Sequence, residues 1–442
     1  MALIQALTIG IDIGGTKVAA GVVDPEGNIL DRLRRDTPTK DPRETEDAIA
    51  EIVHHLESRH DVIAVGIGAA GFVDGTRSSV LFSPHLAWRH EPLRDAVERR
   101  LGLPVVVEND ANAAAWSEWR FGGGQGESHL VCVTLGTGIG GAILNDGALQ
   151  RGKFGIAGEF GHMQVVPGGH RCECGNRGCW EQYASGNALV REARELALSG
   201  SPVAHNLLRA VNGDPSQITG PLVTELAKEG DPVAVELLEE VGRWLGIGLA
   251  NLAAALDPGT FVIGGGVCDA GELLLAPARD AFRRTLTGRG FRPEARVVRA
   301  VLGPEAGMVG AADLAREEAT WLRRVRVKTT AVTAKTAARS GRSARLERAA
   351  RRSAARRTGL SMAETGLRAD QPTEFELDRS ADQPGPGPLS QPSSERLDQS
   401  PADRRSGPSA ERSSETSADV QSEAPGERSS EPVAERLGEQ EA

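Results

Sequence analysis

Two stretches of this chain follow the same plan, and this repetition limits the fold more than any other feature of the sequence. Residues 7–23 read as an apolar strand, a turn rich in Gly and Thr, and a second apolar strand, and residues 130–147 repeat this order. Strands joined by so short a turn form an antiparallel hairpin. Because the unit occurs twice, we expect an α/β fold of two related halves, whose glycine turns face each other across a cleft.

The two glycine turns are candidates for binding the phosphates of a nucleotide. Glycine has no side chain, so backbone N–H groups in such a turn can approach phosphate oxygens closely. The residues concerned are Asp12, Gly14, Gly15, Thr16 and Lys17 in the first turn and Gly136, Thr137 and Gly138 in the second. Asp12 could hold Mg²⁺ through water. A plain hairpin turn would use the same residues, but two turns that grip one nucleoside triphosphate explain the repetition better than coincidence does.

A histidine and three cysteines lie close together in the middle of the chain. They are His162, Cys172, Cys174 and Cys179, in the spacing His-x9-Cys-x-Cys-x4-Cys. Thiolate and imidazole groups suit tetrahedral Zn²⁺, and four such ligands leave no position open for water, which indicates a structural zinc. Two cysteines could instead form a disulfide, or all three could be buried apolar residues, but a chain without a signal peptide keeps its thiols reduced. His170 is a rival fourth ligand, although Glu159 and Gly161 beside His162 favour His162.

A run of polar residues follows the apolar strand at 104–107. Ligands of open α/β sheets bind at the carboxyl ends of strands, and Glu108, Asn109 and Asp110 stand at such an end. Asp110 could accept a proton from a substrate hydroxyl, which makes it the candidate general base, and Asn109 could orient the same substrate through its amide. Either residue could instead cap the helix that starts near Ala111, and Asn112 could equally be the structural residue.

Glycines also end two other buried strands. Gly68 ends the strand at 62–68 and is a candidate sugar contact, although close packing would need the same residue. Gly264 and Gly265 end the strand at 261–264 and could make room for an adenine ring or turn the chain. Apolar spacing predicts helices over 44–58, 92–101, 187–198, 221–229, 231–256, 273–286 and 307–319.

The composition divides the chain into a folded part and a tail. We divide the folded part into an N-terminal lobe, 1–110, and a C-terminal lobe, 111–320. Residues 321–442 are rich in Ser, Arg, Glu and Pro and cannot bury enough apolar area to offset the entropy lost on ordering, so we predict a disordered tail. Its basic first part could bind nucleic acid or a membrane surface, but without interleaved aromatic residues an arm with no such partner is the simpler interpretation.

The sequence contains neither a targeting signal nor a membrane span. The first seven residues include no basic residue and lead directly into a strand. No run of about eighteen apolar residues occurs, as a membrane helix would need. We therefore expect a cytoplasmic protein without a membrane partner.

These motifs together resemble those of the ROK family of sugar kinases, and most closely its bacterial ATP-dependent glucokinases. Asp12-Ile-Gly-Gly-Thr-Lys17 resembles the first phosphate motif of the family, Leu135-Gly-Thr-Gly-Ile-Gly-Gly141 the second, and Glu108-Asn-Asp-Ala-Asn112 the catalytic segment. Gly158-Glu-Phe-Gly-His162 and Cys172-x-Cys-Gly-x-x-Gly-Cys179-x-Glu181 resemble its zinc signature. The resemblance covers residues 7 to about 316, and the tail has no counterpart in it.

The resemblance implies a duplicated actin-like ATPase fold, of the ribonuclease H type, with ATP and Mg²⁺ between two lobes. It implies that Asp110 is the general base, that Asn109, Glu159, His162 and Glu181 bind the sugar, and that His162 also binds zinc with the three cysteines. The expected reaction is phosphorylation of glucose at O6 by ATP.

The resemblance also leaves alternatives for the substrates and the function. They are a kinase for N-acetylmannosamine, fructose or another hexose, and inorganic polyphosphate as the donor. A sugar-responsive regulator is less expected, because family repressors carry a helix-turn-helix ahead of the first phosphate motif and only six residues precede Leu7. The family also leads us to expect a homodimer or a higher homo-oligomer.

Overall fold

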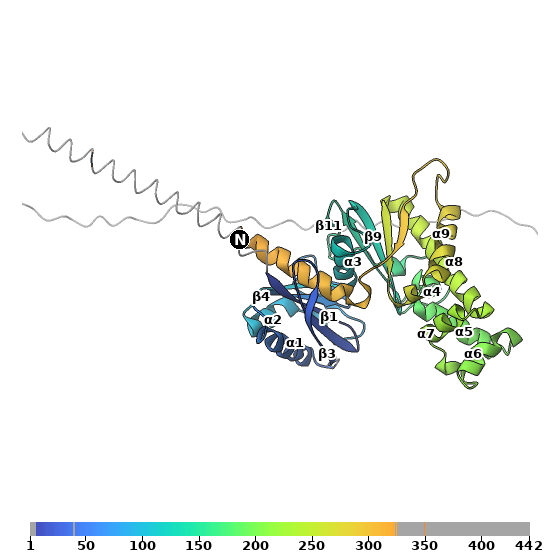
Figure 1. Cartoon of the computed structure of the whole chain (residues 1–442), viewed down its shortest axis with the longest axis horizontal. Coiled ribbons are helices and arrows are strands. Elements are labelled where there is room, and N and C mark those ends of the chain that lie inside the picture. The colour runs from blue at the N-terminus through green and yellow to red at the C-terminus, as the bar shows by residue number, and fades with distance from the viewer. Residues whose placement is uncertain (1–5, 39, 323, 325–348, 350–442) are drawn as a thin grey trace, which may run out of the picture. The chain divides into compact units, whose positions relative to one another are not determined.

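The computed structural model describes residues 6–38, 40–322, 324 and 349, which all belong to one compact unit (Figure 1). The predicted tail, 321–442, lies outside the described residues except at 321, 322, 324 and 349, and so does the basic segment within it. In the part of the chain that the structure describes, no helix combines the length and the apolar character needed to cross a bilayer.

The N-terminal half is built on a five-stranded sheet in the order β3-β2-β1-β4-β8. Its strands are β1 (Leu7–Ile13), β2 (Lys17–Val23), β3 (Ile29–Asp36), β4 (Val62–Ala69) and β8 (Val105–Asn109). β1, β2 and β3 are antiparallel neighbours, whereas β4 pairs in parallel with β1 and β8. Asp12, Gly68 and Glu108 therefore lie in one row across the three parallel strands, close to the edge where these strands end.

The C-terminal half repeats this sheet. Its order is β11-β10-β9-β12-β13, with the strands β9 (His129–Leu135), β10 (Ile139–Asn145), β11 (Ala148–Leu149), β12 (Thr260–Gly264) and β13 (Arg296–Arg299). β9, β10 and β11 are antiparallel neighbours, and β12 pairs in parallel with β9 and β13. Position by position, order and direction match the first sheet, so the expected duplication is confirmed.

Side chains of β1 alternate between two layers of helices. Ile9, Ile11 and Ile13 belong to a core shared with α1 (Pro42–Glu57) and α2 (Leu93–Leu101). Gly10 faces the other way, where a helix over 306–322 crosses the sheet. A methyl group at Gly10 would lie 1.9 Å from the carbonyl oxygen of Met308, so this position has room only for glycine. Figure 1 shows this helix in orange along the blue strands.

The helix over 306–322 packs on the sheet of the N-terminal half. The sequence assigns 307–319 to the C-terminal lobe, but the helix packs on the N-terminal sheet. The Thr8 hydroxyl donates to the carbonyl oxygen of Ala312 at 2.9 Å, and Arg316 donates to the carbonyl oxygen of Ala6 at 3.0 Å. The physical reason is that Gly10 and Gly66 present no side chain on this face of the sheet, so the helix backbone can approach closely. Such a contact between distant segments leaves no local signal.

The helices of the C-terminal half pack on both faces of the second sheet. Val131, Val133 and Leu135 face the core formed with the longer helices, whereas Leu130 and Cys132 face the core that includes α3. The helices are α3 (Asp110–Phe121), α5 (Gly186–Leu198), α7 (Gly220–Lys228), α8 (Pro232–Leu256) and α9 (Glu272–Thr285). The last four agree with the predicted ranges within one residue at each end.

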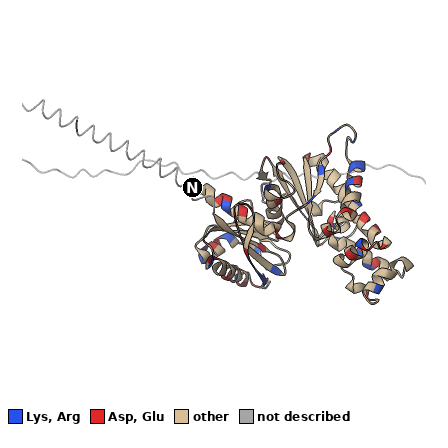
Figure 2. Cartoon of the chain, viewed as in Figure 1, with Lys and Arg blue, Asp and Glu red and all other residues tan. Residues whose placement is uncertain are grey.

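Several short elements complete the described residues. A small sheet, β5 (Phe72–Val73), β6 (Val80–Phe82) and β7 (Arg89–Glu91), follows β4 and was not predicted. The short helices are η1 (Phe160–His162), α4 (Glu181–Ala184), η2 (Pro202–Ala204), α6 (His205–Ala210), η3 (Pro215–Gln217), η4 (Gly266–Ala270) and η5 (Gly303–Glu305). Basic and acidic residues are interspersed over these elements in the view of Figure 2. Such a mixture of both charges is typical of an ordinary solvated surface.

Candidate active site and metal centre

Asp110 stands at the point where β8 ends and α3 begins. The Asn109 side chain caps the helix by accepting a hydrogen bond from the backbone N–H of Asn112 at 3.0 Å. Its Nδ2 donates to Asp110 Oδ1 at 3.0 Å and to the carbonyl oxygen of Gly71 at 3.1 Å. The capping interpretation is therefore correct for Asn109, and the same side chain orients the carboxylate of Asp110.

The charge of Asp110 contributes to the raised pKa of two other carboxyl groups, Asp12 and Glu159. Burial, and then the charge of Asp110, raise the pKa of Asp12 to about 7. Burial also raises the pKa of Asp110, although N–H groups at the start of α3 oppose the rise. Burial raises the pKa of Glu159 as well; His162 opposes this rise, and the charges of Asp110 and Glu181 add to it. Carboxyl groups that interact in this way lie near one another. Raised pKa values of this kind are typical of a site that binds a cation or a proton donor.

A buried ion pair holds the segment before Asp110. Glu108 is only 1% exposed, and its carboxylate accepts from Arg151 Nε at 2.7 Å and Nη2 at 2.5 Å. The other oxygen of Glu108 accepts from the side chain of Asn112 at 3.0 Å and from the backbone N–H of Asn109 at 3.2 Å. Asn112 is therefore a structural residue. Because Arg151 begins the loop that leads to Glu159, one ion pair joins the candidate catalytic segment to this loop.

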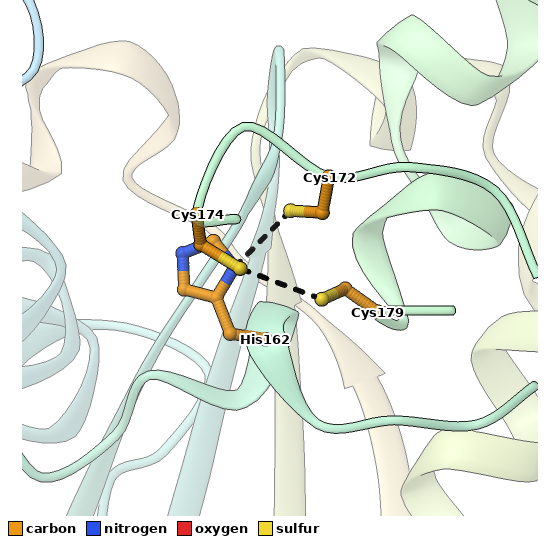
Figure 3. Close-up of side chains that lie close together, drawn as sticks. All are labelled: His162, Cys172, Cys174 and Cys179. Carbon is orange, nitrogen blue, oxygen red and sulfur yellow. Dashed lines mark hydrogen bonds between the residues drawn. The ribbon is translucent and has the colours of Figure 1, made fainter. Parts of the chain in front are cut away.

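The histidine and the three cysteines converge on one point (Figure 3). One potential ligand atom from each of His162, Cys172, Cys174 and Cys179 lies within 4.8 Å of the others. Cys172 Sγ is 3.6 Å from His162 Nδ1, and Cys174 Sγ is 3.6 Å from Cys179 Sγ. His170 instead packs on Tyr183, with ring centroids 5.3 Å apart. The geometry thus brings together the set that includes His162.

These four side chains fit a tetrahedral zinc. With Zn–S bonds of about 2.3 Å, two thiolates on one zinc lie roughly 3.7 Å apart, which matches the Cys174 to Cys179 separation. All the thiols are free rather than paired in a disulfide. Gly175 and Gly178 make the turns between the last two cysteines, with φ of 95° and 76°. A methyl group at Gly178 would lie 1.7 Å from the carbonyl oxygen of Val166, so the loop requires glycine there.

Glu181 and His162 link this cluster to the carboxylates. The Cys172 thiol donates to Glu181 Oε1 at 3.0 Å, and the same oxygen is 3.4 Å from His162 Nδ1. His162 Nδ1 therefore faces the cluster, and Nε2 lies on the opposite edge of the ring. Trp180, fully buried, anchors the segment by donating to the carbonyl oxygen of Trp244 in α8 at 2.8 Å. The candidate sugar ligands are thus fixed by the cysteine loop.

The first glycine turn is a closed hairpin with an exposed tip. The backbone N–H of Gly14 donates to the carbonyl oxygen of Lys17 at 3.0 Å. Thr16 and Lys17 are exposed, and the Lys17 ammonium forms an ion pair with Asp36 on β3. A methyl group at Gly15 would lie 2.8 Å from Cβ of His85. The Gly14 N–H is thus used within the turn and Lys17 is paired with a neighbouring strand, and phosphate binding by this turn stays a prediction.

The second glycine turn rests on the start of α5. The backbone N–H of Gly136 donates to the carbonyl oxygen of Gly138 at 3.0 Å. The carbonyl oxygens of Gly136 and Thr137 accept from the N–H groups of Gly186 and Asn187 at 2.9 and 3.2 Å. A methyl group at Gly138 would lie 2.6 Å from Glu181 Oε2, so this turn lies against a candidate sugar ligand.

The remaining predicted glycines differ in how tightly their surroundings pack on them. Gly68 is buried, and a methyl group there would meet Ala113 Cβ at 3.7 Å and Asp110 Cα at 3.8 Å. Gly265 has φ of 88°, and a methyl group there would lie 2.4 Å from the carbonyl oxygen of Leu135. Gly264 is buried at the end of β12. A methyl group at Gly68 would make only ordinary van der Waals contacts, so close packing does not require glycine there and its role as a sugar contact stays a prediction, whereas Gly265 turns the chain.

Sequence reasoning missed two residues of this region, Arg151 and His85. Arg151 stands in an irregular loop after β11 and forms its ion pair with a residue far away in the sequence. His85 lies in the small unpredicted sheet region and touches Gly15 only through the tertiary structure. No local pattern in the sequence could have found either one.

The comparisons with known proteins agree with this geometry. The sequence profile of the ROK family matches residues 8–318. This chain belongs to the ROK family. The matched range includes both sheets and almost all of the helix over 306–322, so the ROK domain is the whole described fold.

Three relatives show how close the likeness is. A glucokinase of Streptomyces coelicolor is 54% identical over 313 residues, which are 71% of this chain and 98% of that protein. The crystal structure of a ROK family glucokinase from Streptomyces griseus, in complex with glucose and AMPPNP, is 56% identical with a TM-score of 0.65, and covers 71% of this chain and 100% of that chain. A ROK hexokinase from Thermus thermophilus is 36% identical with a TM-score of 0.60, and covers 71% and 99%.

Proposed function

We propose that this ROK protein transfers the γ-phosphoryl group of ATP to O6 of glucose. The observation that carries the proposal is the position of Asp110. Its carboxyl group follows the carboxyl end of β8, the outer parallel strand of the first sheet, and its charge acts on Asp12 beside the first glycine turn and on Glu159 beside the cysteine loop. The glucokinase relatives, one of them with glucose and AMPPNP bound, support the same pair of substrates.

In the proposed reaction Asp110 acts as the general base. It accepts the proton of the O6 hydroxyl as the bond from O6 to Pγ forms and the bond from Pγ to the β-γ bridging oxygen breaks, which releases ADP. The Asn109 amide donates to Asp110 Oδ1 at 3.0 Å and so keeps one carboxylate oxygen oriented while the other is available to the sugar. The transition state of phosphoryl transfer is loose, so alignment of the reactants supplies much of the catalysis.

Glu159, His162 and Glu181 are the proposed sugar ligands, and the cysteine loop holds two of them. Zinc bound by His162 and the three cysteines would fix this irregular loop, which has no regular core of its own. In the chain itself, Glu181 already contacts Cys172 and lies beside His162. Sugar affinity should therefore depend on an intact metal centre.

Mg²⁺ would neutralise phosphate charge when it enters with ATP. Asp12 is the residue proposed to hold it, through water, because Asp12 stands near the end of β1, two residues before Gly14 of the first glycine turn. The raised pKa of Asp12, about 7, fits a group that is stabilised in its charged form only when a cation arrives.

A coupled assay across a sugar panel tests the function. Purified protein with Mg-ATP is offered glucose, mannose, fructose and N-acetylmannosamine, and product formation is followed by ADP release. We expect the highest kcat/KM with glucose, and no activity with 6-deoxyglucose, which binds without an acceptor hydroxyl. A higher kcat/KM with another hexose would reassign the substrate. Inorganic polyphosphate replaces ATP in a parallel series, and efficient transfer from it would reassign the donor.

A further inference from the structure

The segment between β6 and β7 is a rigid loop that carries one exposed histidine. Ser83 closes it, because its hydroxyl donates to the carbonyl oxygen of Ala70 at 2.7 Å and its backbone N–H donates to the carbonyl oxygen of Trp88 at 3.3 Å. Trp88 is fully buried and Leu86 is 4% exposed, so both anchor the loop in the core. His85 lies between these anchors and is exposed.

Arg89 locks the same loop from its other end. Its Nη1 donates to the carbonyl oxygens of Ser83, Leu86 and Trp88 at 2.8, 3.1 and 2.6 Å. Its guanidinium carbon lies 4.3 Å from the centroid of the Phe82 ring, a distance typical of a cation–π contact. Three carbonyls held by one charged group leave the loop backbone little freedom, so His85 is presented in a fixed place.

His85 packs on the first glycine turn and is close enough to the proposed general base for its charge to act there. A methyl group at Gly15 would be 2.8 Å from Cβ and 3.2 Å from Cγ of His85. The part of the His85 side chain nearest its backbone therefore packs directly on the turn. The charge of His85 also acts on the carboxyl of Asp110 and opposes the rise of its pKa. Among the described residues, no hydrogen bond or ion pair engages the His85 ring. An exposed imidazole that is held rigidly beside the glycine turn and near Asp110 is suited to contact a ligand.

We propose that His85 is a catalytic residue that donates a ring N–H to an oxygen of the phosphoryl group in transfer. This rests on the proposed function, because the transferred group must pass from the glycine turn toward Asp110. The groups near that path are acidic, since the charge of Asp110 acts on Asp12 next to the glycine turn, and the Lys17 ammonium is paired with Asp36. A hydrogen-bond donor opposite these carboxyl groups is what a phosphoryl group with three charged oxygens would need there.

Nucleotide binding tests the contact separately from sugar turnover. The variants are His85→Ala, which removes the donor, and His85→Gln, whose amide restores one N–H. His90→Asn is the matched control, because His90 is another exposed histidine of the same small sheet and its φ of 53° is one that Asn tolerates. Affinities for AMPPNP and for ADP are measured by calorimetry with Mg²⁺ and saturating glucose.

We expect His85→Ala to weaken AMPPNP binding by about 10- to 100-fold, the range for a lost hydrogen bond to a charged group, while ADP binding stays unchanged. In turnover, kcat should fall by a similar factor with little change in KM for glucose, and His85→Gln should recover part of both. Equal losses for AMPPNP and ADP, or no loss for either, would overturn the proposal. If the wild type phosphorylates no sugar, the proposed function fails, but the difference between AMPPNP and ADP still decides the role of His85.

Discussion

The ion pair between Glu108 and Arg151 gives the sharpest test of how the catalytic segment is held. Arg151→Met keeps the length and apolar stem of the side chain and removes its charge. It leaves the carboxylate of Glu108, 1% exposed, without the two hydrogen bonds of 2.5 and 2.7 Å that it now accepts from Arg151. A buried charge without its partner is the most unfavourable outcome of such a change.

The expected loss of stability follows from this burial. Removing one partner of a buried ion pair destabilises a protein by about 3 to 5 kcal/mol. The Arg151 side chain is 23% exposed, so water can reach part of the site. We therefore expect the free energy of unfolding to fall by about 3 kcal/mol, the lower end of that range. Adding Glu108→Gln removes the stranded charge. The amide oxygen can still accept from Asn112, and one unsatisfied N–H₂ costs only about 1 to 3 kcal/mol. The double variant should therefore be more stable than Arg151→Met alone.

Urea unfolding of the ligand-free protein measures these differences. Wild type, both single variants and the double variant form a double-mutant cycle. Arg299→Met is the control, because Arg299 pairs with Asp269 at 3.0 Å on the surface, and exposed pairs contribute at most about 1 kcal/mol. The reasoning is refuted if Arg151→Met behaves like the control, or if Glu108→Gln destabilises Arg151→Met further.

Three other predictions concern the base, the metal and the pH dependence. Asp110→Asn should keep glucose binding, seen by calorimetry, and lower kcat by at least ~10², the usual scale of a general base; near-normal turnover would exclude that role. Cys174→Ser should release zinc to a chromogenic chelator and weaken glucose binding, whereas Cys132→Ala, which removes a core thiol outside the cluster, should keep the metal; unchanged glucose affinity in the zinc-free variant would separate the metal from the sugar site. The pKa of Asp12 is raised to about 7, so its ionisation destabilises the folded ligand-free chain as pH rises from about 4 through 7. Asp12→Asn should therefore stabilise the ligand-free chain at pH 8 and have much less effect at pH 4, while it weakens Mg-ATP turnover; equal stabilisation at both pH values would contradict this.

Local patterns predicted most of the regular structure. The alternation of apolar residues at 7–13 and 130–135 produced the two matching hairpins, and the helical spacing at 187–198 and 273–286 gave helices with ends only one residue away. These patterns work because hydrogen bonds within a helix or a hairpin join residues that are close in the sequence. The histidine and cysteine spacing likewise predicted the cluster that the structure brings together.

Contacts between distant segments were not predictable in the same way. The small sheet of β5, β6 and β7 has strands too short to show an alternating pattern, and it presents His85 to Gly15. The return of the helix over 306–322 to the first sheet depends on Gly10 and Gly66, whose need for close packing is visible only when the helix is in place. A single sequence does not record such partners.

The sequence by itself determined the duplicated α/β plan, the candidate base after the apolar strand at 104–107, and the four donors of a metal centre, because each of these is written in residues that are neighbours or follow a regular period. Only the tertiary structure decided that Glu108 is neutralised by Arg151, that His162 rather than His170 joins the cysteines, and that His85 packs on the first glycine turn. The physical reason is that burial and electrostatic partnership depend on distance in space, which a local pattern does not encode.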